Sequence, residues 1–158
     1  MKKLAAIAAL SSLVSSGIPA QEVSTGSLKY LSTVSVAVSN VEKDAEAAGL
    51  SVSQLTADVE QKLRRSRLTI VEKGKKSDGL IYVNVNAMKV NQYLWAYHVE
   101  LVLEQGVVLT RSGFPCVGRT WWTGTLGATR PQDFVTDVRT AVGQAVDSFL
   151  KDYRAENP

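Results

Sequence analysis

The side chains that could do acid–base chemistry come together in one segment, around His98. His98 is the single histidine of the chain, and Glu100 follows it two residues later. Residues two apart in an extended strand point to the same face, so the two groups would be neighbours. A histidine and a carboxylate at that spacing could act as a general acid and base. The sequence offers no third group and no glycine-framed serine nucleophile, so we expect a non-catalytic protein and interpret the pair as part of a solvent-facing strand.

The single cysteine, Cys116, excludes an intramolecular disulfide framework. Zinc sites usually need several histidine or cysteine ligands, and this chain has one of each, so we expect no metal site and no cofactor. The neighbours of the thiol, Pro115 and Val117, carry no charge that would activate it. We expect a buried thiol, and a disulfide to another chain is the alternative.

Aromatic residues are the main candidates for an interaction surface. Tyr93, Trp95 and Tyr97 alternate along one segment, and Trp121 and Trp122 are adjacent in a later one. We expect Tyr97 to face the core, whereas Trp121 and Trp122 must point to opposite faces of a regular strand. Exposed aromatic side chains often mark partner or ligand sites. The predicted interaction residues are therefore Tyr93, Trp95, Trp121 and Trp122, and the alternative is that these rings cap the core.

A run of four cations lies at the end of a predicted helix: Lys62, Arg64, Arg65 and Arg67. Cations at this position are favoured by the helix dipole without binding anything. A site for a phosphate or a lipid head group is the sharper interpretation of the same run, and the sequence leaves both open.

The polar face that carries His98 follows from a predicted hairpin of residues 80–90 and 94–105. A three-residue loop over 91–93 predicts four cross-strand apolar pairs: Val90–Leu94, Val85–Val99, Val83–Leu101 and Ile81–Leu103. A slip of one residue would place polar residues opposite these apolar ones, so this register is preferred. The opposite face then carries four weak candidates for a polar site: Asn84, Asn86, His98 and Glu100.

The remaining elements follow from apolar spacing. Ser51 and Gln54 have the spacing of a capping box, and apolar residues recur behind them at helical intervals, so we expect a helix over residues 51–65. A long final helix is predicted to begin at Thr129 or Arg130. We also expect a helical turn over 42–48 and strands over 33–39, 68–72, 107–110 and 118–123, with a break at 113–115 and with Gly124 and Gly127 ending the last strand.

This order of elements predicts one α+β domain. Two helices would cover one face of a mainly antiparallel sheet, which makes a two-layer sandwich. The sequence contains no internal repeat and no linker, so residues 21–158 are expected to form a single domain.

Residues 1–20 have the pattern of a bacterial secretory signal peptide. Lys2 and Lys3 precede a short apolar stretch over 4–14, and Ala20 is a small residue at a plausible cleavage site. The apolar stretch is too short to span a membrane, and no cysteine is present there for lipid attachment. We therefore expect a periplasmic or secreted protein that is not a lipoprotein. Without the two lysines the charge falls from +3 to +1, which gives no support to nucleic-acid binding.

Several segments carry a resemblance to known proteins: Ala48–Ser51, Val59 and Leu63, Tyr82–Val85, Trp122–Gly124, Phe149–Tyr153 and Asn157–Pro158. Through them the chain resembles a group of small exported bacterial proteins of unknown function, over essentially the whole of residues 21–158. Its order of elements is also similar to envelope domains of the TolB N-terminal and lipopolysaccharide-assembly lipoprotein type. Neither likeness implies a catalytic residue.

These observations together predict a function class. We expect an exported, non-enzymatic domain that binds another component of the cell envelope through a sheet edge or an aromatic surface. A carrier of a small molecule or lipid, with its pocket between sheet and helices, is the alternative. An enzyme that uses His98 and Glu100 is a third possibility.

Overall fold

The computed structural model describes residues 25–72 and 74–158. Along this part of the chain the elements are η1 (Thr25–Leu28), β1 (Thr33–Val38), α1 (Lys43–Ala47), α2 (Val52–Leu63), β2 (Thr69–Ile70), β3 (Gly79–Asn91), β4 (Leu94–Leu109), β5 (Phe114–Thr129) and α3 (Phe134–Glu156). The α+β class is therefore confirmed. The predicted signal peptide lies outside the described residues.

The five strands form one sheet in the order β2-β1-β3-β4-β5. The long strands β3, β4 and β5 pair antiparallel, whereas β1 pairs parallel with both β2 and β3. The sheet is thus mainly antiparallel, as predicted. The sequence left the place of β1 open, and the structure puts it inside the sheet, next to β3.

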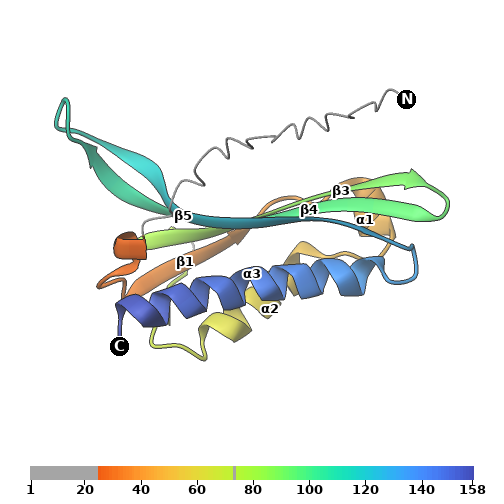
Figure 1. The fold of residues 1–158 in the computed structure, drawn as a ribbon, viewed down its shortest axis with the longest axis horizontal. Helices are drawn as coiled ribbons and strands as arrows, with labels where there is room; N and C mark the ends of the chain where they lie inside the picture. The colour runs from red at the N-terminus through yellow and green to blue at the C-terminus, as the bar shows by residue number, and fades with distance from the viewer. Residues whose placement is uncertain (1–24, 73) are drawn as a thin grey trace, which may run out of the picture.

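The core lies between the sheet and the two longer helices, which run side by side on the same side of the sheet in Figure 1. Alternate strand residues face this core, such as Val34, Val83 and Leu101, because successive side chains of a strand point to opposite faces. Both helices bury one stripe of residues at helical spacing. On α3 that stripe consists of Phe134, Val138, Ala141, Val142, Ala145, Val146, Phe149, Leu150 and Tyr153.

Two tryptophans of the sheet pack against phenylalanines of α3, one toward each end of the helix. Trp95 of β4 stacks on Phe134, with ring centroids 4.2 Å apart and planes 20° from parallel. Trp121 of β5 meets Phe149 edge to face at 5.3 Å. Its indole Nε1 also donates a hydrogen bond of 3.0 Å to Asp152. The indole N–H is therefore satisfied although the ring is buried.

The predicted register of the β3–β4 hairpin is confirmed over the core-facing pairs Ile81–Leu103, Val83–Leu101 and Val85–Val99. The loop prediction is wrong by one residue. Asn91 pairs directly with Leu94, and the register shifts between Lys89 and Asn91. The turn therefore holds two residues, and Val90 is accommodated as an irregularity in β3 instead of facing Leu94.

Two predicted boundaries on β4 and β5 are wrong. Residues 107–109 continue β4 and the chain reverses over 110–113, so the break lies before Phe114 and not over 113–115. The last strand also runs through Gly124 and Gly127 to Thr129. A Cβ atom at Gly127 would lie 2.3 Å from the Tyr97 ring, so this glycine provides room for a cross-strand aromatic ring and does not end the strand.

The helices lie where the sequence predicts them, but the predicted N-terminal cap of α2 and the predicted start of α3 are wrong. The predicted helical turn is α1, and α2 lies within the predicted range, but the Ser51 hydroxyl bonds to the Ser53 hydroxyl at 2.8 Å and caps no backbone N–H. The final helix begins at Phe134 and not at Thr129 or Arg130. Thr129 is the last residue of β5, where it pairs with Trp95. Pairing with β4 therefore keeps Thr129 in β5, although the local sequence predicts that a helix begins there.

Asp78 joins the start of β1 to the segment that enters β3. Its carboxylate accepts hydrogen bonds from the Ser32 hydroxyl at 2.7 Å and from the Ser32 and Thr33 amides at 3.0 and 2.8 Å. These donors, the Ser32 hydroxyl first, lower the pKa of Asp78 to about 2 because they favour the charged carboxylate. Asp78 thus helps to bring β1 and β3 together in parallel.

A lowered pKa makes the Asp78 contribution depend on pH. The folded-state value lies below the unfolded one, so the contribution is present above about pH 4 and is lost as the pH falls toward about 2. We expect Asp78→Asn to be less stable than the parent at pH 6, by a modest amount because the carboxylate is exposed. Urea unfolding at pH 6 and pH 2.5 would measure this. A difference between the two proteins that is equally large at both pH values would contradict the assignment.

Gly79 sits where the sheet leaves no room for a side chain. An added Cβ would lie 2.8 Å from the buried Leu103 side chain and 3.2 Å from the Glu104 carbonyl oxygen. We expect Gly79→Ala to lower the free energy of unfolding by about 1–3 kcal/mol through overpacking. Gly106→Ala is the matched control, since nothing lies within 4 Å of its added Cβ. Its unfolding free energy should stay unchanged or rise by up to about 1 kcal/mol in the same urea titration.

Candidate interaction surface

The four predicted aromatic residues do not form one surface. Trp95 and Trp121 are 3% and 2% exposed, so the prediction of an accessible site is wrong for both, and they belong to the core as the alternative expected. Tyr93 and Trp122 are 72% and 41% exposed. Trp121 and Trp122 do point to opposite faces. Tyr97 is half-buried against the core.

The four polar candidates lie on one face, because Asn84 pairs with Glu100 and Asn86 pairs with His98. Glu100 forms an ion pair of 3.6 Å with Arg119 of the neighbouring strand. Among the described residues it makes no ion pair with His98. The pairing that the sequence predicted therefore brings the residues together without orienting a carboxylate on the imidazole. A catalytic role for this face remains an untested alternative.

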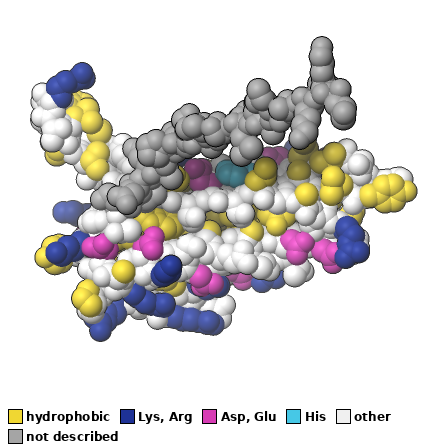
Figure 2. Space-filling view, in the orientation of Figure 1, with side chains coloured by type: hydrophobic (Ala, Val, Ile, Leu, Met, Phe, Trp, Pro, Cys, Tyr) yellow, Lys and Arg dark blue, Asp and Glu magenta, His cyan; other side chains and the backbone are white. Residues whose placement is uncertain are grey.

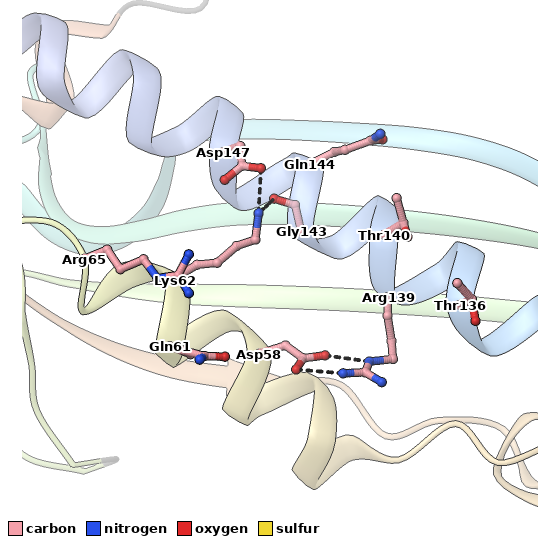
Figure 3. Close-up of a pocket in the computed structure, with 10 residues that line it drawn as sticks. All are labelled: Asp58, Gln61, Lys62, Arg65, Thr136, Arg139, Thr140, Gly143, Gln144 and Asp147. Atoms are coloured by element: carbon pink, nitrogen blue, oxygen red, sulfur yellow. Dashed lines mark hydrogen bonds and ion pairs between the residues drawn. The ribbon is translucent and has the colours of Figure 1, made fainter.

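A polar groove of about 480 Å³ runs between α2 and α3, and Figure 3 shows its lining. Arg139 of α3 holds Asp58 of α2 with two hydrogen bonds of 2.7 and 3.0 Å. These bonds raise the pKa of Arg139. Lys62 donates to Asp147 at 2.6 Å and to the carbonyl of Gly143 at 3.1 Å. Four charges of this groove, Asp58, Lys62, Arg139 and Asp147, thus pair across the two helices and hold them together, whereas Arg65 lines the groove outside these pairs.

The predicted basic run is divided between different partners. Lys62 belongs to the helix clasp, and Arg64 pairs with Glu60 at 2.9 Å, one helical turn earlier. Arg65 lines both the groove and a second cavity of about 410 Å³, and Arg67 and Arg154 line the second cavity alone. The sequence could not show the partner of Lys62, because Asp147 lies on α3, whereas the i,i+4 spacing of Glu60 and Arg64 was a local signal for the other pair.

Among the described residues, exposed apolar side chains gather on a ribbon formed by the ends of β4 and β5. The last residue of β4 that pairs with β3 is Glu104, whereas β4 and β5 continue to pair as far as Leu109 and Phe114. We call residues 106–117 the distal ribbon. Figure 1 shows it projecting from the upper left of the sheet. The register shifts between Leu103 and Glu104, and such a bulge bends a strand pair, which accounts for the change of direction.

Apolar side chains cover both faces of the distal ribbon. Residues that pair directly in antiparallel strands share a face, so Val108 and Pro115 lie on one face and Leu109 and Phe114 on the other. Four of its side chains are between 46 and 72% exposed: Val108, Leu109, Phe114 and Val117. Figure 2 shows this gathering of hydrophobic side chains on the projection. The sequence analysis missed it, although an unbroken apolar run on each side of a turn was the signal.

Cys116 also lies in the distal ribbon, opposite Val107. Its thiol is free and half-buried, so the expectation of full burial is wrong. A ribbon that projects from the body has no core in which to bury a side chain, and this position follows from the topology and not from the residue type.

Two further properties concern the described residues alone. Within residues 25–72 and 74–158, no helix is both long enough and apolar enough to cross a membrane. The same residues hold no group of three or more His, Cys, Asp or Glu side chains placed to share a metal ion.

Comparison with solved structures yields weak likenesses, including one to a PelC variant. No family model matches the chain, and no curated protein matches it. A solved dodecamer of a PelC variant from Paraburkholderia phytofirmans is similar with a TM-score of 0.41 and 11% sequence identity. The match covers 73% of this chain and 82% of that one. A likeness of this strength assigns neither a family nor a function.

The division of the aromatic set can be tested on the two adjacent tryptophans. We expect Trp121→Ala to lower the free energy of unfolding by about 3–5 kcal/mol, because a buried ring and its hydrogen bond to Asp152 are lost. Trp122→Ala should cost about 1 kcal/mol or less, since that ring is partly exposed. Urea unfolding followed by circular dichroism would measure both. Equal losses would contradict the burial described above.

Proposed function

We propose that this chain is an exported, non-catalytic domain that binds a protein component of the cell envelope through its distal ribbon. Its architecture would be the two-layer α+β sandwich that the sequence predicts, with α2 and α3 as one layer. The observation that carries the proposal is the exposed apolar surface on both faces of residues 106–117.

Physical reasons favour a partner for this ribbon. A two-stranded ribbon without a core is marginally stable in water. Apolar surface that leaves water contributes roughly 25 cal/mol per Å², so covering these side chains would stabilise both the ribbon and a complex. A protein groove could cover both faces. β5 is also the last strand of the sheet, and the Ser27 hydroxyl of η1 donates to its Thr120 carbonyl at 2.9 Å. An edge of this kind can accept an added strand.

Export rests on the first 20 residues of the sequence. The pair Lys2–Lys3, the short apolar stretch and the small residue Ala20 support passage to the periplasm or out of the cell. The resemblance to small exported bacterial proteins points to the same compartment. Under this proposal the chain meets its partner there after cleavage near Ala20.

If the protein is instead a carrier, its cavities favour a small polar ligand over a lipid. The cavities of about 480 and 410 Å³ beside α2 and α3 are lined mostly by charged and polar side chains. Such walls suit a small polar ligand better than the tail of a lipid.

The proposal can be tested by native mass spectrometry of the protein purified gently from the envelope fraction of its host. We expect a complex with a second polypeptide. Phe114→Ser combined with Val117→Ser should reduce that complex by about 30-fold, as expected when a central apolar contact worth about 2 kcal/mol is removed.

The matched control is Leu126→Ser, which removes a side chain that is 79% exposed on β5 but lies outside the distal ribbon. This variant should keep the complex. The proposal is wrong if the double variant retains the partner as well as the control does, or if the parent protein is recovered only as a bare monomer.

A further inference from the structure

Three arginines from two distant parts of the chain converge on one cavity. Arg65 and Arg67 follow the end of α2, and Arg154 lies in the last turn of α3. All three line a cleft of about 410 Å³, together with Ser66, Tyr153, Asn157 and Pro158. Lys and Arg side chains gather in the corresponding lower left part of Figure 2, near the C-terminal end of α3.

The cleft has walls that are held in place by other contacts. Tyr153 is buried, with 4% of its surface exposed. The Asn157 amide donates to the Leu28 and Tyr153 carbonyls at 2.8 and 2.9 Å, and its oxygen accepts from the Tyr30 amide at 2.9 Å. The Ser66 hydroxyl donates to Leu63 at 2.6 Å. The Ser66 and Asn157 side chains are thus engaged within the protein, and the guanidinium groups are the charged donors left to meet a ligand.

Among the described residues, no Asp or Glu side chain neutralises the charges of this cleft. By contrast, two nearby cations are paired with carboxylates. Lys62 lies 2.6 Å from Asp147, and Arg64 lies 2.9 Å from Glu60. Within the described residues, no Asp or Glu is at ion-pair distance from the three arginines of the cleft. Arg67 makes one hydrogen bond, of 3.1 Å, to the backbone oxygen of Pro158. Three exposed positive charges at one cavity repel one another unless an anion joins them.

Helix dipoles explain only part of this arrangement. A cation near the carboxyl end of a helix is favoured, and both α2 and α3 end here. One carbonyl at each end is already engaged by a neighbouring side chain, since Ser66 donates to Leu63 and Asn157 donates to Tyr153. The dipoles also do not require that the arginines of two helices line the same cavity.

We propose that this cleft binds a phosphate group. The planar guanidinium donates two parallel hydrogen bonds to phosphate oxygens, and several arginines around one anion match the charge of a phosphate monoester. The phosphate could belong to a free small anion or to the head group of an anionic lipid. The distal ribbon lies elsewhere on the molecule, so this site is independent of the proposed protein partner.

The test uses inorganic phosphate as the first probe and titration calorimetry as the measurement, in chloride buffers of matched ionic strength. The variant Arg65→Gln with Arg154→Gln removes two positive charges that make no ion pair within the described residues, so the fold should be kept. We expect its affinity for phosphate to fall by at least about tenfold. The control is Arg64→Gln with Lys151→Gln, which removes the same charge from the same two helix ends outside the cleft.

The second probe distinguishes the source of the phosphate. Vesicles of phosphatidylglycerol and phosphatidylcholine are compared with vesicles of phosphatidylcholine alone in a flotation assay. Binding of free phosphate that needs Arg65 and Arg154 supports a small anion as ligand. Binding to the anionic vesicles alone, with the same dependence, supports a lipid head group. The proposal is overturned if neither probe binds, or if the cleft variant and the control lose binding equally.

Discussion

The burial of two tryptophans against α3 is the constraint on which the rest of the structure depends. Trp95 stacks on Phe134, and Trp121 meets Phe149 while its indole N–H is held by Asp152. These contacts lie at opposite ends of the helix, so they set its direction across β4 and β5 as well as its distance from them. Large aromatic side chains suit this role because each removes much apolar surface from water and packs with a defined geometry.

With α3 in place, charge pairs position the second helix. The Asp58–Arg139 pair and the contact of Lys62 with Asp147 join α2 to α3 along the groove in Figure 3. The same alignment carries the segment after α2 to the last turn of α3. Arg65, Arg67 and Arg154 meet for that reason, although nearly ninety residues separate them in sequence. The candidate phosphate site is thus a consequence of how the helices pack.

The unequal lengths of the strands explain why the distal ribbon is exposed. β4 and β5 pair beyond the point where β3 begins, and the bulge after Leu103 turns them away from the body. A side chain there cannot reach the core between the sheet and the helices. The apolar residues of the distal ribbon therefore remain in water unless another molecule covers them. This differs from scattered surface hydrophobics, which need no explanation, because these side chains are contiguous and occupy both faces.

The sequence by itself determined the fold class, the places of α1 and α2 and the register of the β3–β4 hairpin, because apolar spacing and the burial of one face are local properties of the chain. It also predicted that Trp121 and Trp122 face opposite ways. Only the tertiary structure decided which tryptophans are buried and where β5 ends and α3 begins. It also decided that Lys62 of the basic run pairs with a carboxylate of α3. Those outcomes depend on partners distant in sequence: Phe134 and Asp152 for the rings, Trp95 for the end of β5, and Asp147 for Lys62. Residue type and spacing along one segment carry no information about such partners, since packing alone brings them together.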